Sequence, residues 1–327
     1  ITRFDGTHPP QYLTDLSSML PYQLFPRARV LVLEPGGGTS VLQAIAGDAV
    51  KVDVVEPFAT LSGLIQGPYG AFSGAIYDLP DVQLQAGDAR QYLDLSDASY
   101  DLVIVDLVDT QDTSATGLAA QRVSYLYTRE AVHSMLNRLA PGGLLSITRW
   151  LQLPPRDMLR LVATVVMALE DRGVRDPGRH LAVIRGWNTT VMLASPSPLS
   201  VQAVQDIRRF AQTRSFDLVH HPGLRPEDVN RFNRLETPLL HDGVVALLSG
   251  ARDEFIEAYP FSIAPVTDDR PFFFRYSRWR NLSELLSLPG GMGYGQIDWG
   301  YWVLVAAALQ ALVLGLVMIL WPLRCLP

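Results

Sequence analysis

The stretch from Arg29 to Ser40, RVLVLEPGGGTS, decides the fold of this chain. Its apolar run VLVL leads directly into Glu34 and the three consecutive glycines Gly36 to Gly38. This order predicts a buried strand, a tight turn and the start of a helix. Glycine is needed at such a turn because a residue without Cβ lets the backbone bend sharply and lets a ligand approach the main chain closely. The stretch therefore predicts a turn that binds a nucleotide-like ligand.

The spacing of the glycines distinguishes two kinds of ligand. A dinucleotide-binding turn, G-x-G-x-x-G, would need a third glycine at position 41, where this chain has Val41. The spacing that fits is acidic-x-Gly-x-Gly, formed by Glu34, Gly36 and Gly38. Its acid lies at the end of the strand, where it can meet an amino group rather than a phosphate. This spacing resembles motif I of the S-adenosylmethionine-dependent methyltransferase fold.

Three further predicted strands deliver an acid or a glycine turn at their carboxyl ends. The second strand ends at Glu56, 20 residues beyond Gly36 (56 − 36), where such folds place the acid that binds ribose hydroxyls. The third ends in Gly87-Asp88-Ala89, where a side chain can cap the adenine amino group, and the fourth ends in Asp106. Ligands of open α/β sheets bind at the carboxyl ends of the strands. These positions together predict a site for an adenosyl cofactor.

From Arg29 to about Ser195 the chain alternates strand and helix patterns, as a doubly wound sheet requires. After the first strand, the predicted parallel strands are Val52 to Val55, Val82 to Ala86, Asp101 to Val105 and Leu144 to Thr148. The predicted helices are Ser40 to Ala46, Ala59 to Gln66, Leu118 to Leu139 and Pro155 to Arg172. His180 to Arg185 and Thr189 to Ala194 predict a closing antiparallel hairpin. The fold class is therefore α/β, a methyltransferase-type, Rossmann-like doubly wound sheet that is mostly parallel.

The sequence predicts four regions. Residues 1–27 form an extended lead-in or a small hairpin, and residues 28–195 form the adenosyl-cofactor-binding domain. Residues 196–283 form a helical extension that contains the segment TDDRPFFF, and residues 299–321 form a transmembrane helix.

The last region is the apolar run WGYWVLVAAALQALVLGLVMILW. Val303 to Leu320 carries no charge and a single polar side chain, Gln310. A helix of this length, at about 1.5 Å per residue, spans roughly the 30 Å of a hydrocarbon core. Aromatic residues bracket the run, as they do at membrane interfaces: Trp299, Tyr301, Trp302 and Trp321. The sequence therefore predicts a helix that crosses a membrane and contacts lipid.

Composition excludes several other functions. The net charge of −6 over 327 residues argues against a nucleic-acid surface, which would need clustered cations, and suits a cationic substrate. The one cysteine, Cys325, excludes an internal disulfide and a cysteine metal cluster. His220 and His221 are neighbours on an extended segment and point to opposite faces, so we interpret them as packed or solvated. No metal site is predicted.

With these residues in place, the chain resembles the spermidine synthase family, and more narrowly its membrane-attached bacterial members. The resemblance covers roughly Pro21 to Tyr276. It is carried by the motifs VLVLEPGGGTS, VDVVEPF, GDAR, YDLVIVDLVDT, SYLYTREA, LAPGGLLSITRW and PVTDDRPFFF. The resemblance implies transfer of an aminopropyl group from decarboxylated S-adenosylmethionine to a diamine. It also implies that Asp106 is the catalytic acid and that Asp109 is a second aspartate on the loop over the site.

Two departures from the family pattern keep other functions open. The family has an aspartate after the three glycines, where it meets the aminopropyl amine, and this chain has Thr39. The family's substrate-binding tyrosine near the N-terminus has no secure partner, since Tyr12 falls out of register. The alternatives are a methyltransferase that uses intact S-adenosylmethionine and an inactive accessory subunit of a membrane complex.

The acidic residues also suit a protonated diamine as substrate. One nitrogen must lose a proton to become the nucleophile, while carboxylates hold the second, protonated nitrogen. Asp106, Asp109 and Asp112 offer three acids on one loop. Asp268 and Asp269 either cap a turn or reach the same cation. Because adenosyl sulfonium compounds are made in the cytoplasm, we expect a bacterial inner-membrane protein whose domain faces the cytoplasm. A homodimer or a partner in a membrane complex stays open.

Overall fold

The computed structural model describes residues 2–107, 123–278 and 299–324. The chain forms two compact units. Of the described residues, the first unit contains 2–107, 124–259 and 263–271. Of the described residues, the second contains Val123 and residues 260–262, 272–278 and 299–324. The candidate site lies within the first unit.

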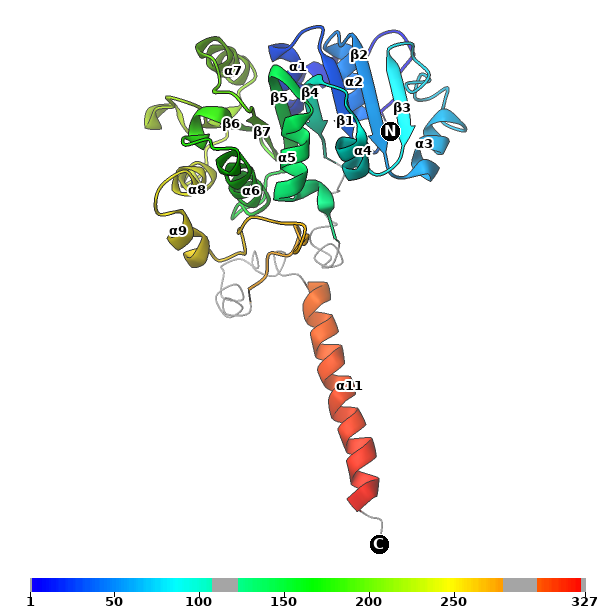
Figure 1. Ribbon diagram of the computed structural model, residues 1–327, viewed down its shortest axis with the longest axis vertical. Helices are drawn as coiled ribbons and strands as arrows, with labels where there is room; N and C mark the ends of the chain where they lie inside the picture. The colour runs from blue at the N-terminus through cyan, green and yellow to red at the C-terminus, as the bar shows by residue number, and fades with distance from the viewer. Residues whose placement is uncertain (1, 108–122, 279–298, 325–327) are drawn as a thin grey trace. The chain divides into compact units, whose positions relative to one another are not determined.

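The described part of the first unit is built on one eight-stranded sheet (Figure 1). Its strands are β1 (Arg29–Leu33), β2 (Lys51–Glu56), β3 (Val82–Ala86), β4 (Tyr100–Val105), β5 (Leu139–Trp150), β6 (Leu181–Arg185), β7 (Thr189–Ala194) and β8 (Asp217–His220). Their order across the sheet is β3-β2-β1-β4-β5-β7-β6-β8. Strands β1 to β5 are parallel, and β7 lies antiparallel between β5 and β6. The predicted doubly wound sheet with its closing hairpin is therefore confirmed.

Helices cover both faces of this sheet (Figure 1). They are α1 (Leu20–Leu24), α2 (Thr39–Ala46), α3 (Ala59–Gln66), α4 (Ala89–Leu95), α5 (Arg129–Asn137), α6 (Asp157–Asp171), α7 (Val201–Thr213), α8 (Leu239–Leu247) and α9 (Arg252–Ala258). On one face α1, α2 and α7 pack in the same buried cluster as Val30 and Val32 of β1. Leu31 and Leu33 alternate with these residues and are also fully buried, since α4, α5 and α6 lie side by side on the other face. Burial on both faces explains why β1 is a continuous apolar run.

Three elements differ from the sequence prediction. Residues 2–27 are not an extended lead-in or a hairpin, because they form short helical segments at Gln11–Asp15, Ser17–Met19 and α1. Strand β5 begins five residues earlier than expected, at Leu139, and its pairing with β4 shifts register beside the Pro141-Gly142-Gly143 turn. Strand β8, within a region interpreted as helical, adds an antiparallel edge next to β6.

The predicted helix from Leu118 to Leu139 is shorter in the structure. Helix α5 begins at Arg129, because Thr128 has an extended backbone and its side-chain oxygen accepts a hydrogen bond from the Ala131 N–H at 3.2 Å. This is an ordinary N-cap arrangement, in which a threonine satisfies an unpaired donor of the first turn. Residues 118–122 lie outside the described part of the chain.

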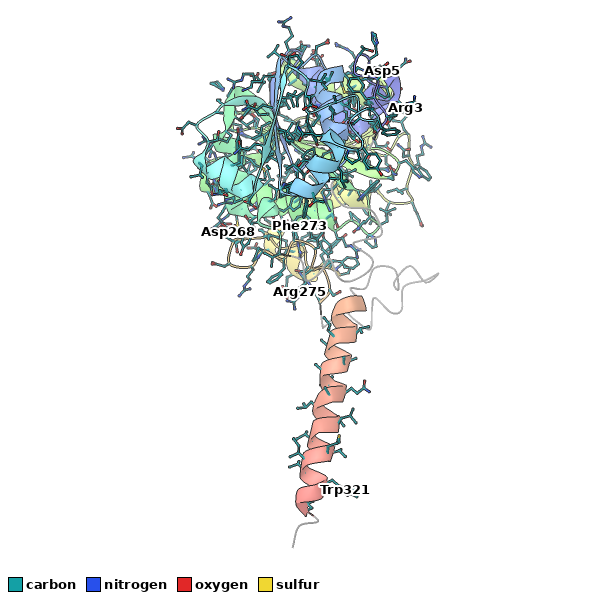
Figure 2. All side chains as sticks on the ribbon, turned by 90° about the vertical axis from the view of Figure 1, so that its right-hand side faces the viewer. Arg3, Asp5, Asp268, Phe273, Arg275 and Trp321 are labelled. Atoms are coloured by element: carbon teal, nitrogen blue, oxygen red, sulfur yellow. The ribbon has the colours of Figure 1, made fainter. Side chains whose placement is uncertain are left out.

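In the second unit, helix α11 (Trp299–Arg324) contains the apolar span Val303–Trp321. The span has a mean hydropathy of 2.7, and none of it is buried against other parts of the protein. Figure 2 shows its side chains standing out around the helix, with Trp321 near its carboxyl end. The helix is long and apolar enough to cross a membrane.

Candidate functional site

The candidate site lies at the carboxyl ends of the central strands, where the strand order changes direction. Chain order runs outward from β1 to β2 and β3 on one side, and β4 and β5 lie on the other. Leu33 is paired in register with Val55 of β2 and with Val105 of β4. The residues that follow these three, Glu34, Glu56 and Asp106, therefore leave the sheet at the same level. Such a switch point is where open α/β sheets bind their ligands.

The turn between β1 and α2 is held by backbone conformations that favour glycine. Gly36 and Gly38 have φ values of 56° and 82°, and Gly38 directly precedes the first residue of α2. Glu34 also has a positive φ, 52°, which is uncommon for a residue with a side chain. A hydrogen bond from the Glu34 N–H to the Val55 carbonyl, 2.8 Å, fixes this conformation. No described heavy atom lies within 4 Å of the position of a Cβ on Gly36, so this side of the turn is open to a ligand.

Glu56 connects the turns that follow β1 and β2. The residue is 1% exposed, and its carboxylate accepts hydrogen bonds from the Gly36 N–H at 3.1 Å and from the Phe58 N–H at 2.9 Å. Burial raises the pKa of the Glu56 carboxyl, while these two N–H donors act in the opposite direction. Each carboxylate oxygen has two lone pairs, so both oxygens can also accept from ligand hydroxyls.

Gly87, Asp88 and Ala89 follow β3. The Gly87 N–H donates to the Glu56 carbonyl at 3.1 Å, which joins this turn to the end of β2. Asp88 is exposed, and one of its oxygens caps α4 by accepting from the Gln91 N–H at 2.9 Å. Ala89 is buried. A cavity of about 370 Å³ lies beside this turn and is lined in part by Gly87, Asp88 and Gln91.

Asp106 provides a buried carboxyl group at the end of β4. It is 8% exposed, and its Oδ1 accepts a hydrogen bond from the Leu107 N–H at 2.7 Å. Burial raises the pKa of the Asp106 carboxyl, against the lowering effects of this N–H and of the Ser40 hydroxyl. A carboxylate with a raised pKa is a better proton acceptor than an exposed one.

The other predicted substrate residues are not all described. Asp109 and Asp112 lie outside the described residues. Asp268 accepts a hydrogen bond from the Thr128 hydroxyl at 2.6 Å and pairs with Arg90 at 3.4 Å, so it supports the amino end of α5. Asp269 is exposed on the same segment. The structure thus brings Gly36, Glu56 and Asp106 to one edge and ties Asp268 to the helices α4 and α5.

Two buried tyrosines near α2 were missed by the sequence analysis. The Tyr22 hydroxyl donates to the Ser40 carbonyl at 3.0 Å, and the Asp106 charge adds to burial in raising the pKa of Tyr22. Tyr77 lies close to Gly38, and the Glu56 charge adds to burial in raising its pKa. Neither tyrosine is part of a local sequence motif, because both reach α2 through tertiary packing.

The neighbouring histidines His220 and His221 are packed against other parts of the protein. His220 lies with its Nε2 2.9 Å from the Gly178 carbonyl, and His221 is 1% exposed. Both are therefore packed residues, as the sequence analysis interpreted them. Within the described ranges, no group of three or more histidine, cysteine, aspartate or glutamate residues could hold a metal ion.

No protein-family model matches the chain. Among curated proteins it is similar to polyamine aminopropyltransferase 2 of Pseudomonas aeruginosa, with 31% identity over 124 residues, 36% of this chain and 32% of that protein. It is also similar to polyamine aminopropyltransferase 2 of Hyperthermus butylicus, with 32% identity over 121 residues, 35% of this chain and 36% of that protein. The matches thus span about a third of the length of these relatives.

Solved structures resemble the fold at low identity. Spermidine synthase from Thermotoga maritima aligns with a TM-score of 0.42 and 16% identity, covering 73% of this chain and 70% of that one. Human methyltransferase-like protein 13 aligns with a TM-score of 0.43 and 15% identity, covering 63% of this chain and 92% of that one. At these values the likeness carries no information about activity. Over about a third of its length, the chain is thus similar in sequence to polyamine aminopropyltransferases.

Proposed function

We propose that this protein is a membrane-anchored aminopropyltransferase that moves an aminopropyl group from decarboxylated S-adenosylmethionine to a diamine or polyamine. The observation that carries the proposal is the common register of Leu33, Val55 and Val105, which brings Glu56 and Asp106 to either side of the glycine turn. The similarity to polyamine aminopropyltransferases over about a third of their length supports the same reaction class.

In this proposal the adenosyl donor lies over the open face of Gly36. Glu34, Gly36 and Gly38 form the turn beneath it, and Glu56 accepts hydrogen bonds from the ribose hydroxyls. Asp88 and Ala89 contact the adenine ring. The turn fits such a ligand because its backbone is open at Gly36 and an acidic residue lies at the carboxyl end of each neighbouring strand.

The reaction needs a proton acceptor more than an activated leaving group. The amine nitrogen forms a bond to the propyl carbon on sulfur, the carbon–sulfur bond breaks, and its electron pair stays on sulfur to give methylthioadenosine. The proton from the nitrogen passes to a carboxylate, for which we propose Asp106, since burial raises its pKa. Holding the nitrogen and the carbon in line supplies much of the remaining rate enhancement.

The acceptor is proposed to be a small cationic amine. Asp109 and Asp112 would hold its second nitrogen, and Asp109 would act beside Asp106 as a catalytic residue. Asp268 and Asp269 are further candidates. For Asp268 such a contact would compete with its existing bonds to Thr128 and Arg90.

A methyltransferase is the second candidate, and Thr39 favours it. Thr39 is the first residue of α2, where the resembled family has the aspartate that meets the aminopropyl amine. Without that carboxylate the site has less to distinguish decarboxylated from intact S-adenosylmethionine. An accessory subunit that binds the nucleoside without turning it over is the third candidate.

Helix α11 supports anchoring to a membrane. Its span Val303–Trp321 matches the thickness of a hydrocarbon core and has no buried face. We propose that it inserts in the bacterial inner membrane with the sheet-containing unit in the cytoplasm, where the adenosyl donor is made.

Product analysis separates the three candidates. Aminopropyl transfer releases methylthioadenosine, methylation releases S-adenosylhomocysteine, and an accessory subunit releases neither. Membranes that contain the full chain are incubated with each donor in turn, and the nucleoside product is identified by mass. Methylthioadenosine that forms only when a diamine is present supports the proposal.

A further inference from the structure

Tyr77 has a buried hydroxyl group that pairs with none of the residues described by the structure. The residue belongs to the segment between α3 and β3 and is 5% exposed. Its backbone is fixed by a turn, in which the Asp78 N–H donates to the Ala75 carbonyl at 2.8 Å and the Ala75 N–H donates to the Gly70 carbonyl at 2.9 Å. The position of the side chain is therefore set by its own segment.

Within the described part of the chain, the Tyr77 hydroxyl oxygen has no hydrogen-bond partner. Other buried tyrosines of this unit differ. The Tyr22 hydroxyl donates to the Ser40 carbonyl at 3.0 Å, and the Tyr100 hydroxyl donates to Asp53 at 2.9 Å. Buried polar groups in native proteins are nearly always paired, because leaving one unpaired costs the full desolvation penalty of that group. The Tyr77 hydroxyl therefore calls for a partner beyond those that the described residues supply.

The hydroxyl packs against the glycine turn of the candidate site. It lies 3.7 Å from the position that a Cβ on Gly38 would occupy, directly before the first turn of α2. Burial, with a smaller contribution from the nearby Glu56 charge, raises the pKa of the Tyr77 phenol, so the hydroxyl stays protonated at neutral pH. A neutral hydroxyl can donate one hydrogen bond and accept others, which suits a hydroxyl partner.

We infer that the Tyr77 hydroxyl is a ligand-binding group, which hydrogen-bonds a ribose hydroxyl of the adenosyl compound that Glu56 also holds. The inference rests on the proposed function, because that function supplies a ribose at the glycine turn. It adds a contact from the α3–β3 segment to the contacts from the strand ends. Since the hydroxyl is already desolvated in the free protein, binding recovers a hydrogen bond without a new desolvation cost at Tyr77.

The test compares Tyr77→Phe with the wild type and with Tyr69→Phe, all as full chains in detergent. Tyr69 lies on the same segment but is 49% exposed, so it is the matched control. Calorimetry with methylthioadenosine should give a dissociation constant on the order of tenfold higher for Tyr77→Phe, and an unchanged one for Tyr69→Phe. Without ligand, the thermal midpoint of Tyr77→Phe should equal or exceed that of the wild type, because the variant removes an unpaired buried group.

The 2′-deoxy and 3′-deoxy analogues of methylthioadenosine identify the partner. For the analogue that lacks the bonded hydroxyl, the wild type and Tyr77→Phe should bind equally. The inference is overturned by equal affinities for methylthioadenosine, by an equal loss for both analogues, or by a lowered midpoint in the free variant. If the wild type fails to bind methylthioadenosine at all, the proposed function fails and the inference fails with it.

Discussion

The carboxylate of Glu56 accepts a hydrogen bond from the Gly36 N–H at 3.1 Å, although the two residues are 20 positions apart in the chain. This bond joins the glycine turn after β1 to the end of β2. A second bond, from the Phe58 N–H at 2.9 Å, makes Glu56 the shared acceptor of both turns. The acid that is expected to bind the ribose thus also shapes the turn over which the ligand would lie.

Glu56→Ala should weaken the binding of methylthioadenosine by about 1 to 3 kcal/mol, roughly 5- to 150-fold, because ligand hydroxyls would be left without an acceptor. Calorimetry measures the change, with Glu254→Ala as the control for the loss of one acid, since Glu254 is exposed on α9. Circular dichroism checks that the variant is folded, because Glu56 also holds two turns. Equal affinity of the wild type and Glu56→Ala would rule out the ribose assignment.

Asp106→Asn should stabilise the protein at neutral pH more than at acid pH. Burial raises the pKa of the Asp106 carboxyl in the folded state. The stability that the protonated carboxyl contributes is therefore fully present below the pKa that Asp106 has in the unfolded chain. It is lost as the pH rises through the pKa of Asp106 in the folded protein. Asparagine does not titrate, and its carbonyl oxygen can still accept from the Leu107 N–H. Unfolding midpoints measured between about pH 4 and about pH 8 should therefore diverge as the pH rises. A constant difference across this range would contradict a raised pKa.

Helix α11 should hold the protein in membranes. The full chain, expressed in bacteria, should remain in the membrane fraction after a carbonate wash and should need detergent for extraction, because about 30 Å of apolar helix favours the hydrocarbon core. A chain that ends at Ser283 should move to the soluble fraction. Recovery of the full chain in the supernatant after the wash would show that α11 does not span the membrane.

The sequence predicted the elements whose signals are local. Helix α3 and strand β3 have the predicted bounds, because apolar periodicity and flanking glycines define both. Strand β8 was missed because it is only four residues long and exists through its pairing with β6, more than 30 positions earlier. Helix α5 was predicted too long because its start depends on the Thr128 cap, and the same threonine bonds to Asp268, 140 residues away.

The residues of the candidate site also differ in whether a local sequence signal locates them. Glu56 and Asp106 could be located from sequence, because each follows an apolar strand and parallel strands end at one edge. Their ligand roles remain predictions. Tyr77 could not be located, since nothing near it in the sequence signals that its hydroxyl has no partner among the described residues or that it approaches Gly38. Whether a buried hydroxyl finds a partner depends on tertiary packing, which a local sequence pattern does not encode.

The most direct test of the proposed function measures methylthioadenosine release from decarboxylated S-adenosylmethionine and putrescine, with membranes that contain either the wild type or Asp106→Asn. The account predicts release that depends on the diamine for the wild type. For Asp106→Asn it predicts a rate lower by roughly 10²- to 10⁴-fold with little change in nucleoside binding, because the proton acceptor is lost. No release from the wild type with any diamine, or release of S-adenosylhomocysteine from intact S-adenosylmethionine instead, would contradict it.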